Sequence, residues 1–418
     1  MKKVTYFGLL LAVALTGLSS CSSSDDVTSD PTNPKSGESR LTLTISTPVA
    51  KTASAKGNSF AMGSRATDIT TAPTVANEQQ INHITVGIFS SDGNTVRTIQ
   101  ELSSGTGIGT YTQESNSATA TAHIVTNSLA NGDSILVACN APAGTFQGVQ
   151  TAAQFRAKTE TIDKSLAMEF GGEQPGTSLV GDNIPMFGKG TLSKNTDNDN
   201  FSANVDVYHQ TAKVTLTSLT VDFDENGPYK DASFTPTQIF LINVPDDLKF
   251  DTDASTGTAT LWQGYDNTGV NKSTYKEYLS TSAFSNPTAL SGVASAASTA
   301  KFGSTYYFYT MPNYKTDKDV RTKLVIKGTF KANKDDQSST VVYYPVPLNA
   351  HYTNGTVDHA TGDVGPAFAV HANKDYQCTV TIKTKGAANP TDDVTPQQAT
   401  INVTVKPFAA ATQTTVFE

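Results

Sequence analysis

The chain has 418 residues, a formal net charge of −8 at pH 7 and three cysteines. An acidic chain with no basic run interleaved with aromatic residues is not expected to bind nucleic acid. Short apolar stretches recur between frequent turn signals, and Thr, Ser, Asn and Gly are abundant, so the sequence predicts an all-β protein of about two or three domains.

The chain begins with a signal for export. Lys2 and Lys3 precede an apolar run over residues 4–18, which is too short for a membrane-spanning helix, and small residues lead into Cys21. This pattern is typical of a bacterial lipoprotein signal peptide at residues 1–20, with an acylated Cys21 as the new N-terminus. More than one acyl chain gives a stable membrane anchor. A plain secretory signal beside a chance cysteine is the alternative.

A tether, a strand and a loop follow the signal. Residues 21–40 are mostly small and polar, and they predict a disordered tether. Leu41, Leu43 and Ile45 then alternate with threonines, which is the period of a strand with one apolar face. The next residues are again small and polar and predict an exposed, cleavable loop. We interpret residues 41–65 as a removable plug strand and its cleavage loop.

Two long stretches rich in strand patterns form the body of the chain, at residues 66–199 and 200–398. A polar run over residues 194–200 separates them and predicts the boundary between two β-sandwich domains. The most helix-like pattern lies at residues 152–170. A polar insertion over residues 251–300 contains the single tryptophan, Trp262, and the sequence does not indicate its role.

Residues 399–418 end the chain with a second strand that resembles the plug strand. Ile401, Val403 and Val405 alternate with Asn and Thr, and a proline and Phe408 follow. An acidic, proline-flanked linker at residues 390–396 precedes this strand. We hypothesise that the two strands compete for one groove, the first as a plug and the second as a donor to a neighbouring molecule. The alternative is that such patterns recur by chance in any all-β protein.

The sequence lacks the usual motifs of catalytic, metal-binding and phosphate-binding sites. The six histidines show no HxH or HExxH spacing, and the Asp197–Asp199 region lacks the glycine and glutamate of a calcium loop. Nucleophile-elbow and phosphate-loop motifs do not occur either. The sequence therefore predicts a protein that is not an enzyme and that uses neither a metal nor another cofactor.

Two cysteines remain after Cys21. Cys139 and Cys378 each lie within a strand pattern, far apart in the sequence. Buried free thiols are the preferred interpretation, and a disulfide between them is the alternative in an exported protein.

Taken in order, several short motifs resemble the type V (fimbrillin) fimbrial subunits of bacterial outer membranes. The lipoprotein start resembles that family, as does the Ser-Arg-Ala junction at Arg65 and Ala66. The other motifs are VACNAP at 137–142, IPM at 184–186, QTAKVTL at 210–216, NKDY at 373–376, TVTIK at 379–383, VTVKPF at 403–408 and the segment 413–417.

This resemblance implies two transthyretin-like β-sandwich domains in tandem and export as an outer-membrane lipoprotein. It further implies that an arginine-specific protease cuts between Arg65 and Ala66, and that copies then polymerise head to tail by strand exchange into a cell-surface fimbria. Other fimbrial subunits are the remaining partners that it implies.

The sequence thus predicts a structural shaft subunit of a fimbria that supports adhesion. An accessory or tip adhesin is the first alternative, and a terminal donor strand favours the shaft over it. The second alternative is a surface glycan-binding lipoprotein, for which Trp262, Tyr265, Tyr275 and Tyr278 are the candidate aromatic platform. The preferred interpretation of these four residues is that they fill the core beneath the long insertion.

Overall fold

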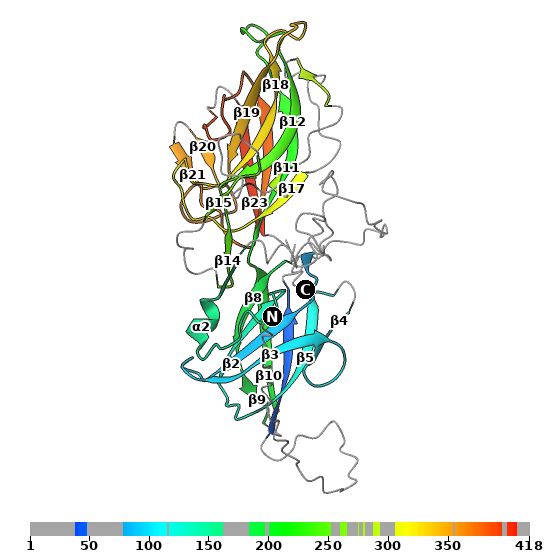
Figure 1. Ribbon diagram of the computed structural model, residues 1–418, viewed down its shortest axis with the longest axis vertical. Coiled ribbons are helices and arrows are strands. Elements are labelled where there is room, and N and C mark those ends of the chain that lie inside the picture. Colours follow the sequence, from blue (N-terminus) through cyan, green and yellow to red (C-terminus); the bar gives the residue numbers. More distant parts are fainter. Residues whose placement is uncertain are drawn as a thin grey trace, which may run out of the picture.

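The computed structural model describes residues 38–47, 78–114, 117–161, 184–196, 200–251, 260–265, 275, 279–280, 287–292, 306–353, 356–394 and 399–407. Cys21, Arg65, Ala66 and Phe408 lie outside these residues. Strands dominate the described parts, which confirms the all-β prediction. Figure 1 shows two groups of strands, one above the other along the long axis.

The first group is a nine-stranded sheet in the order β1-β5-β4-β3-β2-β6-β8-β10-β9. β1 also pairs with β10, so the sheet closes on itself in a barrel-like ring, with β9 outside the ring. Its strands are β1 (Glu38–Ser46), β2 (Ile84–Phe89), β3 (Val96–Ser104), β4 (Thr110–Gln113), β5 (Thr119–Asn127), β6 (Ser134–Cys139), β8 (Met186–Thr191), β9 (Ser193–Lys194) and β10 (Asn200–His209).

Alternation of apolar and polar residues explains this closed sheet. In β10, buried positions alternate with more exposed ones from Phe201 to His209. The inward residues of β1, β5 and β10 belong to one apolar cluster. Because side chains alternate between the two faces of a strand, each of these strands supplies one apolar face to the interior of the ring.

The second group consists of two four-stranded sheets, β17-β11-β22-β23 and β16-β12-β18-β19. Residues of both sheets belong to one large apolar cluster. The strands are β11 (Ala212–Val221), β12 (Ser233–Ile242), β16 (Leu290–Ser291), β17 (Tyr306–Thr310), β18 (Lys323–Lys331), β19 (Thr340–Pro347), β22 (Lys374–Ile382) and β23 (Ala399–Pro407).

Several short elements lie outside the large sheets of the two groups. β7 (Thr159–Thr161), from the first half of the chain, pairs with β14 (Asp247–Lys249), from the second. The other short elements are β13 (Val244–Pro245), β15 (Leu261–Trp262), β20 (His351–Thr353), β21 (Thr356–Asp358) and helix α2 (Ala152–Arg156). In the helix-like pattern at 152–170, the first five residues form this helix and β7 begins soon after it, while residues 162–170 lie outside the described residues. None of the described residues forms a helix that is long and apolar enough to cross a membrane.

The expected boundary at residues 199 and 200 lies within the closed sheet rather than between the two groups. β10 begins at Asn200 and pairs with β1, β8 and β9. Strand partners change only after β10, between His209 and Ala212. The polar run has the composition of a linker, but it connects β9 to β10, where Lys194 pairs with Phe201. Turns and linkers share the same polar composition, so composition alone does not distinguish them.

The burial of β1 generates a prediction about stability. Leu43 is completely buried at the centre of β1, so Leu43→Ala should lower the free energy of unfolding by about 2–5 kcal/mol through lost burial and a cavity. Thr42→Ala, on the exposed face of the same strand, should cost less than about 1 kcal/mol. Urea unfolding of the uncleaved protein measures both. Equal costs would contradict the inward orientation of Leu43.

Candidate functional site

The position of β1 between β5 and β10 is the candidate functional site. β1 runs antiparallel to β5 and parallel to β10, and both ladders extend along most of the strand. Leu43 is paired with Ala122 on β5 and with Ala203 on β10, so small residues flank the large side chain. Beyond the strand, the Thr47 backbone N–H donates to the Ala118 carbonyl at 2.8 Å.

The three predicted plug residues have the burial of core residues. Leu41, Leu43 and Ile45 are at most 1% exposed. Burying three such side chains contributes roughly 5–9 kcal/mol as an upper bound. Without β1, an apolar slot and two unpaired strand edges, on β5 and β10, would face solvent. Exposed edges of this kind readily pair with another strand.

The predicted donor residues lie elsewhere, at the edge of a sheet in the second group. β23 pairs antiparallel with β22 from Ala399 to Pro407. Val403 and Val405 are 5% and 4% exposed and belong to the large apolar cluster, whereas Ile401 is only partly buried against it. Residues 399–407 are therefore part of the C-terminal sheet in this monomer, and not a segment separate from it. Within one molecule, β1 and β23 occupy different sheets.

The acidic linker before β23 is held by two cations. The Lys323 ammonium and the Arg321 guanidinium both donate to Oδ1 of Asp393 at 2.8 Å, and Lys323 also donates to the Thr391 carbonyl. Burial of Asp393 opposes its ionisation, but these hydrogen bonds prevail and hold the pKa of Asp393 below its usual value. Ionic contacts and hydrogen bonds thus hold Thr391 and Asp393 against the beginning of β18.

A buried polar network lies where the two groups of strands meet. The Lys213 ammonium on β11 donates to the Glu78 carboxylate at 2.6 Å, and the Tyr309 hydroxyl on β17 donates to the same oxygen at 2.9 Å. Burial raises the pKa of Glu78 even though Lys213 and these hydrogen bonds oppose the shift. Burial also lowers the pKa of His209 to about 4, and Nε2 of its neutral ring donates to the Glu78 carbonyl at 2.6 Å.

This network attaches the segment that follows the predicted cleavage loop to the C-terminal sheet. Glu78 is the first described residue after residues 48–77, and its partners lie on β11 and β17, in the sheet that contains β23. Sequence reasoning missed Glu78, because a single glutamate outside a strand pattern carries no signal of burial.

The other sequence predictions can be placed as well. Trp262 and Tyr265 are buried and Tyr275 is half-buried, so these residues form no exposed aromatic platform; Tyr278 lies outside the described residues. Cys139 and Cys378 are buried free thiols, and burial raises the pKa of each. Within the described ranges, no three His, Cys, Asp or Glu side chains gather as they would around a metal ion.

Comparison with known proteins supports a fimbrial relationship. Residues 42–218 match the family model of the major fimbrial subunit protein (FimA). The match confirms the resemblance for this part of the chain, and it agrees with the prediction of a structural subunit rather than an enzyme. No curated protein matches the chain.

Solved structures share the fold. A fimbrilin (FimA) from Porphyromonas gingivalis W83 has 16% identity and a TM-score of 0.55, over 89% of this chain and 99% of that chain. A candidate cell adhesion protein from Bacteroides eggerthii DSM 20697 has 18% identity and a TM-score of 0.54, over 88% of this chain and 96% of that chain. Another candidate cell adhesion protein, from Parabacteroides distasonis ATCC 8503, has 16% identity and a TM-score of 0.54, over 89% of this chain and 99% of that chain. At these identities the likeness concerns the fold alone.

The Glu78 network generates a pH-dependent prediction. Lys213→Met leaves a buried carboxylate without its cation and should lower the free energy of unfolding by about 3–5 kcal/mol near neutral pH. Removing the cation raises the pKa of Glu78 further in the folded state. A carboxylate with a raised folded pKa stabilises the fold at low pH and loses that contribution as the pH rises, so the cost should be larger near pH 8 than near pH 5.

Denaturant unfolding at the two pH values measures this cost. The matched control is Glu78→Leu combined with Lys213→Met, which removes both charges and should recover most of the stability at neutral pH. A cost for Lys213→Met that does not change with pH would contradict the pairing.

Proposed function

We propose that this chain, whose residues 42–218 match the FimA major fimbrial subunit family, is a structural subunit of a cell-surface fimbria that polymerises by strand exchange. One observation carries the proposal: a single N-terminal strand closes the sheet, and its apolar face is completely buried. A strand that occupies such a slot from one end of the chain can be replaced by a strand of the same pattern.

Proteolysis after Arg65 is the proposed first step. A cut there detaches all of β1 from the rest of the chain. Arg40 is the other arginine nearby, but it lies within β1, where its neighbours pair with β5 and β10. A paired strand in the middle of a sheet resists a protease, whereas a loop of small polar residues is a preferred site. An arginine-specific protease is therefore a proposed partner, with Ala66 as the new N-terminus.

Strand replacement is the proposed second step. Ile401, Val403 and Val405 have the same spacing of two residues as Leu41, Leu43 and Ile45. The donor strand of a second copy would form backbone hydrogen bonds with β5 and β10 and place alternate side chains in the slot, with Phe408 as a further anchor. Head-to-tail contacts of this kind need not close into a ring, so they generate a filament.

Export and domain organisation complete the proposal. Residues 1–20 would act as the signal peptide, Cys21 as the lipid attachment point and residues 21–40 as the tether at the outer membrane. We infer two transthyretin-like β-sandwich domains in tandem, the first built on the closed sheet and the second on the two four-stranded sheets. Other fimbrial subunits would add to the same filament.

A shaft role is preferred over the alternatives. A tip adhesin need not donate a strand, whereas β23 has the apolar alternation that a donor needs. The glycan-binding alternative required exposed aromatic residues, and Trp262 and Tyr265 are buried.

Arg65→Ala should give a stable full-length protein that does not polymerise. β1 would remain tethered beside its slot, and a tethered strand outcompetes a free one through its high effective concentration. Electron microscopy of surface filaments, together with N-terminal sequencing of the assembled subunits, tests this. Lys56→Ala, in the same predicted loop, is the matched control and should assemble normally. Assembled subunits that begin before Leu41 would contradict the mechanism.

A further inference from the structure

A loop of the same domain lies against the outer edge of β23 at Thr404 and Val405. β22 pairs with one edge of β23, and on the opposite edge the Val405 N–H donates to the Thr361 carbonyl at 2.9 Å. Thr361 and Thr404 form a parallel bridge there. Gly362 follows with a φ of +97°, and a Cβ at this position would collide with the Val405 carbonyl oxygen. The loop backbone therefore lies directly against β23.

Asn349 fixes the shape of this loop from inside. Its side-chain oxygen accepts from the Ala360 N–H at 2.9 Å, and its side-chain nitrogen donates to the Ala369 carbonyl at 2.7 Å. Its backbone carbonyl accepts from the Phe368 N–H at 2.8 Å. Asn349 is completely buried, so one residue ties both ends of the loop to the domain.

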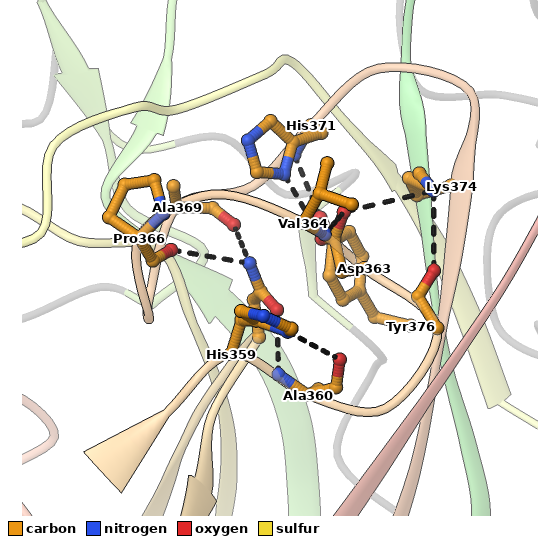
Figure 2. A network of polar contacts seen from close by, with 11 residues as sticks. His359, Ala360, Asp363, Val364, Pro366, Ala369, His371, Lys374 and Tyr376 are labelled. Carbon is orange, nitrogen blue, oxygen red and sulfur yellow. Dashed lines mark hydrogen bonds and ion pairs between the residues drawn. The ribbon is translucent and has the colours of Figure 1, made fainter.

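Asp363 lies at the centre of a polar network that holds the middle of the loop (Figure 2). Its Oδ2 accepts from the Tyr376 hydroxyl at 2.8 Å and lies 3.0 Å from Nδ1 of His371. Its Oδ1 accepts from the Val364 N–H at 2.9 Å, and the Lys374 ammonium lies 3.7 Å away. Lys374 also donates to the Gly362 carbonyl at 3.3 Å. The carboxylate thus has partners on both of its oxygens.

The electrostatics of Asp363 favour its charged form. Its side chain is completely buried, and burial alone would oppose ionisation. The hydrogen bonds from His371 and Tyr376 prevail and hold the pKa of Asp363 below its usual value. A buried carboxylate in its charged form makes strong hydrogen bonds and is costly to leave without partners.

Tyr376 connects this network to the strand that the loop covers. It lies on β22, where its backbone is in register with Val405 of β23. Its hydroxyl donates to Asp363 and accepts from the His371 N–H at 2.8 Å. Tyr376 therefore has two roles: it pairs with Val405 from one edge of β23, and it holds the loop that bonds to Val405 at the other edge. β22, β23 and the loop are locked together at this one level of the sheet.

We propose that residues 360–371 form a clamp that retains β23 in its own domain, and that Asp363 is the positioning residue that holds this clamp closed. At Thr404 and Val405 the clamp occupies the edge at which β23 would otherwise accept another strand, and it must open before β23 can leave. The retention of β23 follows from these contacts alone. Its consequence, that the clamp delays donation to a second copy, rests on the proposed function.

Hydrogen exchange of the uncleaved full chain tests the clamp. Asp363→Asn removes the charge, Tyr376→Phe removes the hydroxyl, and Gly362→Ala forces the loop away from Val405. Each should accelerate exchange of the β23 amides about tenfold, because strong hydrogen bonds to a buried charge are lost or the loop is displaced. The amides of β1, in the closed sheet, should exchange as in the unmodified protein.

Asp358→Asn is the matched control, because this carboxylate is exposed and lies 3.8 Å from Nε2 of the half-buried His359. It should leave β23 exchange unchanged. The clamp is wrong if β23 exchange stays at the unmodified rate in Gly362→Ala and Tyr376→Phe, or if all three variants accelerate β1 and β23 equally.

Assembly of the cleaved proteins separates this inference from the proposed function. Faster filament growth by Asp363→Asn would support both. Faster exchange of β23 with no change in filament growth would support the clamp and contradict a donor role for β23.

Discussion

A single terminal strand, β1, closes the N-terminal sheet, and the burial of that sheet's interior depends on it. β1 forms backbone ladders with β5 on one side and β10 on the other, and its apolar face fills the interior between them. The chain cannot lose this strand and remain closed, since two unpaired edges and an apolar slot would result. Removal of β1 therefore leaves a site in which the binding of a replacement strand is strongly favoured.

The same chain ends in a strand of matching pattern, and two requirements act on it. β23 must be stable in its own sheet before assembly, which its apolar packing, the Asp393 linker contacts and the clamp over Val405 provide. A donor role, as proposed, also requires β23 to leave that sheet, and an edge strand has fewer ladders to break than an interior one. Polar contacts suit such a role, because hydrogen bonds and ion pairs depend steeply on geometry and can be lost in one step.

Sequence periodicity predicted the strands, but it did not predict the polar networks that hold them together. The alternation at Leu41, Leu43 and Ile45 predicted a buried strand, because a period of two directly reports one apolar face. The polar run at residues 194–200 predicted a boundary at a position inside the closed sheet, since polar composition alone does not distinguish a connection between paired strands from a linker. Glu78 carried no local signal, because its partners Lys213 and Tyr309 lie on strands distant in the sequence. Asp363 lies near its partners in the sequence, but no periodic pattern reports how the loop folds back on Tyr376.

A cryo-electron microscopy structure of assembled fimbriae tests the central claim most directly, because it identifies the strand between β5 and β10. We expect side-chain density there to fit residues 399–407 of a neighbouring subunit, and residues 38–46 to be missing from the filament. Density that fits Leu41, Leu43 and Ile45 of the same chain, with β23 still paired to its own β22, would contradict that claim.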